Sequence, residues 1–182
     1  MYTTLIKNQT KSHPILSYAI KVFLGSLFVA ASAQISIPFY PVPMTMQPAA
    51  LMIVGLMCPP RMAASIVAVY LAEAFVGLPV LSNFYGGPAH LFGTRGGFIF
   101  GFLPLAFLTS YISHLSKTLL NQIIACSVGT MALYFFGVSW LTQFIGLDKA
   151  LQFGLFPFLL EIPLFIGLAI SSAWFLKNRA SK

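Results

Sequence analysis

Two loops rich in proline and glycine carry many of the hydrogen-bonding side chains in this chain of 182 residues. One loop follows the first long apolar stretch, and the other follows the third. Their polar side chains are Gln34, Tyr40, Thr45, Gln47, Asn83, Tyr85, His90 and Arg95. Amides and hydroxyls donate and accept hydrogen bonds, and a guanidinium offers a planar fork that matches a carboxylate. If the protein binds a small ligand, we expect the site at these two loops.

The three acidic residues of the chain are Glu73, Asp148 and Glu161. Glu73 and Glu161 fall inside apolar stretches, where a central charge costs about 2.5–3.5 kcal/mol in a membrane and so indicates a function or a specific partner. Glu161 is either a carboxylate that stabilises the beginning of a helix or a ligand contact. A structural role explains Glu73 better than ligand binding, for example an ion pair with Arg95.

Motifs for catalysis, nucleotide binding and metal binding are missing from the sequence. It contains no G-x-x-x-x-G-K-[ST] loop for ATP phosphates and no H-E-x-x-H zinc motif. His13, His90 and His114 are scattered, and neither Cys58 nor Cys126 has metal-like spacing. We expect no catalytic residue, no metal site and no cofactor, so the protein is not expected to be an enzyme.

The composition is that of a membrane protein. Hydrophobic residues make up 58% of the chain and charged residues only 7%, with a mean hydropathy of +0.89. A soluble domain is about 25% charged, because its surface must be hydrated. The net charge of +7 fits basic residues that flank membrane spans on the cytoplasmic side, so it does not indicate nucleic-acid binding. We find no removable signal peptide at the N-terminus.

Apolar stretches separated by proline, glycine or charged residues predict an all-α integral membrane protein with six transmembrane helices. The predicted spans are residues 15–37, 47–58, 62–76, 96–112, 119–137 and 156–176. Residues 138–155 are ambiguous, with a turn expected at Asp148 and Lys149. The second and third spans are short for a full crossing, which favours a pocket sunk into the outer half of the bundle.

Basic residues orient the predicted bundle. One side carries Lys7, Lys11, Arg61, Lys117, Lys177, Arg179 and Lys182, and the opposite side carries Arg95 and Lys149. The positive-inside rule therefore places both termini in the cytoplasm and the two polar loops outside. A single transmembrane domain over residues 1–182 is expected, composed of a cytoplasmic segment (1–14), the six-helix bundle (15–176) and a basic cytoplasmic tail (177–182).

Small side chains form a flat face on the first predicted helix. Ser26 and Ala30 lie four residues apart, and Ala31 lies beside them. Such a face permits close packing, either against another helix of the same bundle or against a second membrane subunit. Both alternatives stay open.

Three segments carry a family resemblance: AQISIPFYPVPMTMQ, YLAEAFVGLPV and GGPAHLFGTRGGFIFGF. Together with looser similarity near the C-terminus they cover more than half of the chain. They resemble the BioY family, the biotin-binding S components of energy-coupling-factor (ECF) vitamin transporters. The resemblance implies the six-helix S-component fold. It also implies a biotin pocket near the outer surface, closed by the loop after the first helix and the loop between the third and fourth.

The resemblance also implies ligand contacts. Asn83 and Arg95 stand where the family has residues that contact biotin, and would bind its ureido oxygen and its carboxylate. The sixth helix departs from the family pattern, because PFLLEIPLF stands where PFLPGDLLK is common. Glu161 is the nearest counterpart of the family's aspartate and would accept from the ureido N–H groups. The remaining expected contacts are Tyr40 and Tyr85 on the ring, and Gln34, Thr45 and Gln47.

We therefore expect a multi-pass protein of the bacterial cytoplasmic membrane that captures biotin outside and delivers it inward. Because it has no ATP-binding motif, it would depend on a transmembrane coupling subunit, docked at Ser26, Ala30 and Ala31, and on ATP-binding subunits. The alternatives are a solitary biotin transporter and an S component for a different vitamin. An intramembrane enzyme is disfavoured, because no paired acids or histidine cluster converge.

Overall fold

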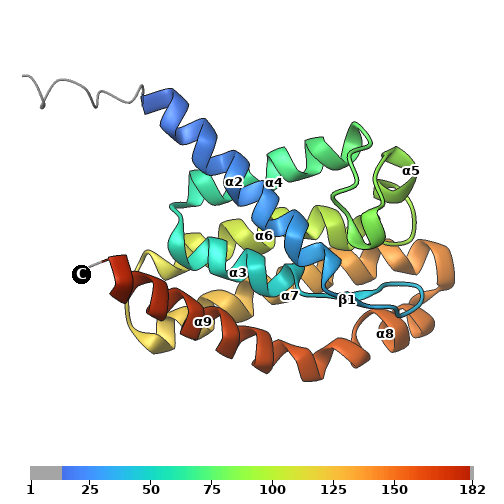
Figure 1. Cartoon of the computed structure of the whole chain (residues 1–182). Helices are drawn as coiled ribbons and strands as arrows, with labels where there is room; N and C mark the ends of the chain where they lie inside the picture. Colours follow the sequence, from blue (N-terminus) through green and yellow to red (C-terminus); the bar gives the residue numbers. More distant parts are fainter. Residues whose placement is uncertain (1–13, 181–182) are drawn as a thin grey trace, which may run out of the picture.

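A computed structural model describes residues 14–180 as a bundle of helices with one short β-hairpin (Figure 1). Its six longer helices correspond to the six predicted spans: α2 (Pro14–Gln34), α3 (Gln47–Met57), α4 (Pro60–Phe75), α6 (Gly96–Ser113), α7 (Leu119–Ile145) and α9 (Glu161–Ala180). The shorter elements are β1 (Ser36–Ile37), β2 (Met44–Thr45), α5 (Pro88–Leu91), α8 (Leu147–Gly154) and the 3-10 helices η1 (Ser82–Phe84) and η2 (Phe156–Leu160). Most of the predicted cytoplasmic N-terminal segment lies outside the described residues, as do Lys7, Lys11 and Lys182.

The helices have the lengths and composition of membrane spans. Within residues 14–180, four stretches are long and apolar enough to cross a membrane: Ile15–Gln34, Gly96–Ser113, Leu119–Ile145 and Leu147–Arg179, the last of which contains α9. α3 and α4 have 11 and 16 residues. At about 1.5 Å per residue each is shorter than the hydrocarbon core of about 30 Å. The prediction that the second and third spans are short is therefore confirmed.

α6 packs most closely against α7 and also contacts α3 and α4 (Figure 1). Glycines permit the close approach of α6 and α7. A Cβ atom at Gly97 would lie 2.5 Å from the carbonyl oxygen of Phe136, and a Cβ atom at Gly137 would collide with the ring of Phe98. The first turn of α6, which begins directly after Arg95, is therefore packed tightly against the second half of α7.

The first helix ends at Gln34, earlier than the predicted end at Ile37. Residues 36–37 instead form an antiparallel pair with residues 44–45, in which Ser36 faces Thr45. The segment between the two strands contains three prolines, which lack the N–H group that a continuing helix needs. The first polar loop therefore forms a hairpin, which connects the end of α2 to the beginning of α3.

The C-terminal third also differs from the predicted boundaries. α7 continues to Ile145, and residues 147–154 form the helix α8 where a turn was expected. Gly146 separates the two helices with a φ of +80°, a conformation that glycine adopts without a Cβ clash. Asp148 lies in the first turn of α8, where the helix dipole favours an acid. The sixth span begins as the 3-10 helix η2, and α9 itself begins at Glu161.

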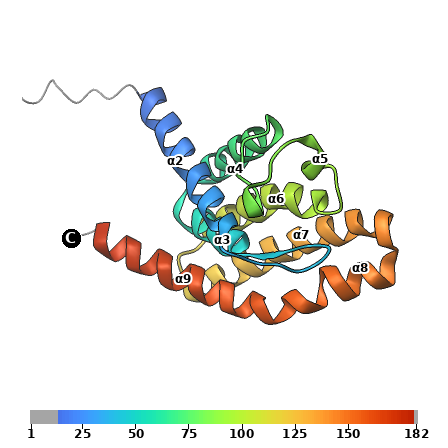
Figure 2. The same ribbon diagram turned by 45° about the vertical axis from the view of Figure 1, so that its right-hand side comes forward.

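The two ends of the bundle differ in charge. The end on the left of Figures 1 and 2 contains the α3–α4 connection, the α6–α7 connection and the end of α9. These segments carry Arg61, Lys117, Lys177 and Arg179. The opposite end contains the hairpin, α5 and α8. Arg95 and Lys149 lie at the opposite end, as predicted, and the assignment of the more basic end to the cytoplasm stays a prediction.

Candidate functional site

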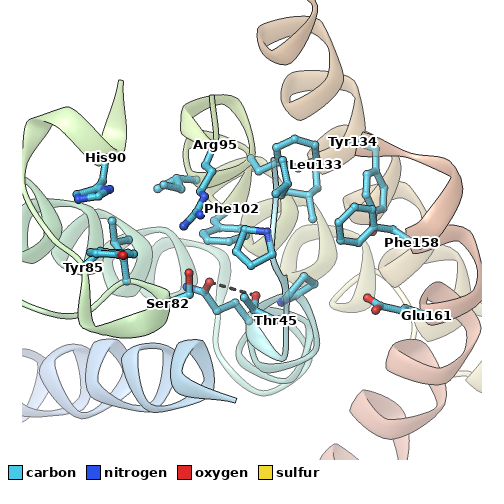
Figure 3. A pocket seen from close by; sticks show the side chains of 17 residues that line it. Thr45, Ser82, Tyr85, His90, Arg95, Phe102, Leu133, Tyr134, Phe158 and Glu161 are labelled. Carbon is cyan, nitrogen blue, oxygen red and sulfur yellow. Dashed lines mark hydrogen bonds between the residues drawn. The ribbon is translucent and has the colours of Figure 1, made fainter. Parts of the chain in front are cut away.

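A cavity lies between the hairpin, the α4–α6 loop and the helices α3, α6, α7 and α9. The cavity is open at its mouth and has a volume of about 60 Å³. Its lining residues are Val42, Pro43, Thr45, Gln47, Pro48, Leu81, Ser82, Tyr85, His90, Arg95, Phe98, Ile99, Phe102, Leu133, Tyr134, Phe158 and Glu161 (Figure 3). Both polar loops contribute residues to this cavity, and whether it binds a ligand stays a prediction.

Arg95 lines one side of the cavity. It occupies the N-cap position of α6, and its Nε donates a hydrogen bond to the carbonyl oxygen of Pro41 at 3.3 Å. This bond ties the guanidinium to the hairpin loop and leaves its terminal N–H groups for other partners. The expected ion pair with Glu73 is replaced by a different contact, because Glu73 Oε1 accepts from Ser26 Oγ at 2.9 Å.

Glu161 lines the opposite side of the cavity. It is the first residue of α9, where the orphan N–H groups of the first turn favour a carboxylate. In Figure 3 its carboxylate lies on the right, below Phe158 and Tyr134, whereas Arg95 projects from the other side. Glu161 is half-buried. The cavity therefore has a cation at one side and an acid at the other.

Gln47 and Thr45 are fixed by a chain of hydrogen bonds. Gln47 Nε2 donates to the hydroxyl of Tyr70 at 2.6 Å, and that hydroxyl donates to the carbonyl oxygen of Val80 at 3.2 Å. Thr45 Oγ1 donates to Gln47 Oε1 at 3.2 Å, drawn as the dashed line in Figure 3. Gln47 and Tyr70 are 5% and 0% exposed. The chain links the hairpin, α3, α4 and the second loop, and so sets the shape of this wall.

The second loop adds an aromatic wall near Arg95. The rings of Tyr85 and His90 stack with their centroids 4.5 Å apart and their planes 18° apart. Both residues line the cavity. His90 was one of the polar loop residues noted in the sequence but was not predicted to contact a ligand.

Three predicted ligand contacts, Gln34, Tyr40 and Asn83, are not among the lining residues. Gln34 instead clamps the second loop, because its Nε2 donates to the carbonyl oxygen of Leu81 and its Oε1 accepts from the N–H of Phe84. The Tyr40 side chain is 85% exposed.

Asn83 is exposed and has a φ of 60°. This left-handed conformation is one that asparagine tolerates better than most residues, so Asn83 forms the turn of η1. The preceding residue, Ser82, is buried and faces the cavity instead. Ser82 therefore lines the candidate site although the sequence did not reveal it, and only its neighbour was singled out.

Most of the apolar lining was also missed. Phe98, Ile99 and Phe102 follow Arg95 on α6, and their position after a candidate ligand residue was the available signal. Tyr134 and Phe158 come from α7 and η2 and had no local signal. Their rings pack on Phe98 at centroid distances of 6.2 and 6.4 Å. The cavity is thus a mainly apolar slot with polar groups at both sides, which suits an elongated ligand with polar ends.

The small-residue face of α2 is divided between the inside and the outside. Ser26 is fully buried and donates a hydrogen bond to Glu73 of α4, so it packs inside the bundle. Ala30 is half-buried and Ala31 is exposed. Of the three residues expected to dock a partner, Ala31 is the one whose side chain is open to the surroundings.

Comparisons with known proteins agree with the resemblance in the motifs. A model of the BioY family matches residues 6–182. The "Probable biotin transporter BioY" of Pyrococcus horikoshii is 34% identical over 144 residues, which are 78% of this chain and 86% of that protein. The "Biotin transporter BioY" of Thermotoga maritima is 30% identical over 140 residues, which are 76% of this chain and 83% of that protein.

A solved structure gives the fold. The crystal structure of "the S-component for biotin from an ECF-type ABC transporter" matches with a TM-score of 0.77 and 24% sequence identity, over 95% of both chains. The predicted all-α S-component fold of a multi-pass membrane protein is therefore confirmed. The family match spans nearly the whole sequence, and this chain belongs to the BioY family.

Proposed function

We propose that this protein binds biotin in the cavity between the two loops and acts as the biotin-specific S component of an ECF-type transporter. The proposal is supported by the names of its relatives and by the fold that it shares with a biotin S component. The observation that carries it is the placement of Arg95 and Glu161 at opposite sides of one apolar cavity. Biotin has a carboxylate at one end and a ureido group at the other, separated by apolar atoms.

In the proposed complex Arg95 pairs with the biotin carboxylate. The guanidinium fork matches a carboxylate, and its bond to Pro41 pre-orients it. Ser82, on the same side of the cavity in Figure 3, offers a hydroxyl as a second donor. Tyr85 and His90 enclose this end of the ligand.

The ureido group then lies at Glu161. The carboxylate of Glu161 accepts from ureido N–H groups, and the hydroxyl of Tyr134, which also lines the cavity, is a candidate donor for the ureido oxygen. The thioether ring packs against Phe98 and Phe102, which excludes water from the polar contacts. A direct contact with Asn83 would require η1 to rearrange, because that side chain is exposed in this structure.

Ligand-dependent stabilisation tests this proposal. We expect biotin to raise the thermal unfolding temperature of the purified protein in detergent, since a ligand at 100 times its Kd stabilises a protein by about 2.7 kcal/mol. Thiamine and riboflavin serve as ligands of the same uptake class and should have no effect. Stabilisation by one of these vitamins, but not by biotin, would favour the alternative of an S component with a different substrate.

We further propose that uptake is energised by a transmembrane coupling subunit and ATP-binding subunits. The sequence lacks a phosphate-binding loop of its own, which supports an external source of energy. Uptake of radiolabelled biotin into biotin-starved cells, with and without a co-expressed coupling module, tests this. Equal uptake in both cases would favour the solitary transporter.

A further inference from the structure

A second cavity lies between the beginning of α7 and the second half of α9, at the basic end of the bundle. We call it the α7/α9 groove; its volume is about 520 Å³. Figures 1 and 2 show the C-terminal part of α9 projecting from the bundle at this end. Residues 174–179 are all exposed. The groove shares no lining residue with the candidate biotin site, so a ligand here would serve a separate role.

The outer end of the α7/α9 groove is positively charged. Lys117 and Lys177 line it, and both side chains are exposed. The three acidic residues of the chain all lie in the described part of the molecule, and none of them lines the groove. The two ammonium groups are therefore not neutralised by a lining carboxylate and attract an anion.

The part of the groove away from the lysines is mainly apolar, lined by Leu119, Gly167, Ile170 and Trp174 with Gln122 and Ser171 among them. From Lys177 the groove extends along α9 past Trp174 and Ile170 to Gly167, a distance of about 15 Å at 1.5 Å per residue. A Cβ atom at Gly167 would meet nothing within 4 Å, so the missing side chain leaves this part of the groove open. Trp174 is 67% exposed, and tryptophan is enriched where a membrane meets water.

We propose that the α7/α9 groove binds an anionic phospholipid from the cytoplasmic leaflet. The headgroup phosphate lies between Lys117 and Lys177, and an acyl chain lies along Trp174 and Gly167. A soluble anion would use only the charged end of the groove. A peptide segment is disfavoured, because its backbone would reach hydrocarbon depth without hydrogen-bond partners.

Quenching of tryptophan fluorescence by brominated lipids tests the proposal at the groove itself. The chain has two tryptophans, so Trp140→Phe leaves Trp174 as the only indole. The full-length variant is reconstituted into phosphatidylcholine vesicles that contain increasing fractions of brominated phosphatidylglycerol or brominated phosphatidylcholine. We expect half-maximal quenching at a roughly thirtyfold lower fraction of the anionic lipid, because each of the two lysines near the membrane surface favours it by about 1 kcal/mol. Equal quenching by the two lipids overturns the proposal.

Matched variants separate the groove from the general charge of this end. Replacing both Lys117 and Lys177 by Gln should abolish the preference, and Gly167→Leu should weaken it without changing the charge. Replacing Lys21 and Arg61 by Gln removes the same charge outside the groove and should leave the preference intact. A preference that survives loss of Lys117 and Lys177, or that millimolar inorganic phosphate abolishes, contradicts a phospholipid site.

Native mass spectrometry of the unmodified protein gives an independent measurement. Equimolar phosphatidylglycerol and phosphatidylcholine compete for the protein in detergent, so no tryptophan needs to be replaced. We expect the anionic lipid to remain bound preferentially, and to lose this advantage when both groove lysines are Gln. Equal retention of the two lipids by the unmodified protein contradicts the proposal.

Discussion

Arg95, at the N-cap of α6, and Glu161, at the first position of α9, line the same cavity from opposite sides. The bundle thereby holds a cation and an acid apart across an apolar slot (Figure 3). A charge in such surroundings is costly unless it is paired. A ligand that pairs with both groups at once therefore gains from two interactions that the protein has already positioned.

Arg95→Ala is expected to weaken biotin binding by roughly tenfold to a hundredfold, since a hydrogen bond to a charged group contributes about 1.5–3 kcal/mol. Biotin amide, which lacks the carboxylate charge, should lose much less affinity. Isothermal titration of both ligands checks this. Arg95→Lys keeps the charge but loses the fork and the bond to Pro41, so it should give an intermediate loss for biotin. Equal losses for biotin and its amide would contradict carboxylate pairing.

Glu161→Gln is expected to lower biotin affinity by about tenfold, because a neutral amide oxygen accepts hydrogen bonds more weakly than a carboxylate. Asp148→Asn is a matched control, because Asp148 is an exposed acid on α8 outside the cavity. The control should bind biotin as the unmodified protein does. Unchanged affinity in Glu161→Gln would remove this residue from the site.

Tyr70→Phe is expected to destabilise the protein by about 1–3 kcal/mol, because Gln47 then lacks an acceptor and the carbonyl of Val80 lacks a donor in a buried place. Biotin affinity should also fall, since Gln47 loses its fixed orientation. Tyr111→Phe removes the hydroxyl of an exposed tyrosine and should change neither property. Thermal unfolding and biotin titration of both variants measure the difference.

Gly97→Ala is expected to destabilise the α6–α7 contact strongly, because the added methyl group would overlap the backbone of Phe136 and the side chain of Trp140. Gly167→Ala places the same methyl group in open space on α9. It should be neutral or stabilising, since alanine is favoured over glycine in a helix by up to about 1 kcal/mol. Comparable unfolding temperatures for the two variants would contradict the close packing of α6 and α7.

Ala31→Trp tests the proposed docking of a coupling subunit on α2. Ala31 is exposed, so a large side chain there should leave biotin binding unchanged but reduce uptake that depends on the coupling module. Ser26→Ala should behave differently. It removes the hydrogen bond to Glu73, whose Oε2 already has no partner among the described residues, and so should lower stability instead. Unimpaired module-dependent uptake by Ala31→Trp would place the docking surface elsewhere.

The helix boundaries show which parts of the fold could be predicted from local sequence. Apolar length and low charge predicted the membrane class and the six longer helices, because a helix must satisfy its backbone in lipid whatever its neighbours are. The end of the first helix was misplaced, because the cross-strand pairing of Ser36 with Thr45 is not a local property. The helix α8 was missed for a related reason, since its polar residues resemble those of a loop.

The side chains of the candidate site show which features the sequence could not predict. The motifs identified the family, the two loops and the candidate roles of Arg95 and Glu161. Only the tertiary structure turned Ser82 instead of Asn83 toward the cavity, brought Tyr134 to its wall and buried Ser26 against α4. A membrane helix is apolar on its lipid face as well as on its packed face, so periodicity does not distinguish the two. The direction of each side chain is decided by the helix or loop that packs beside it.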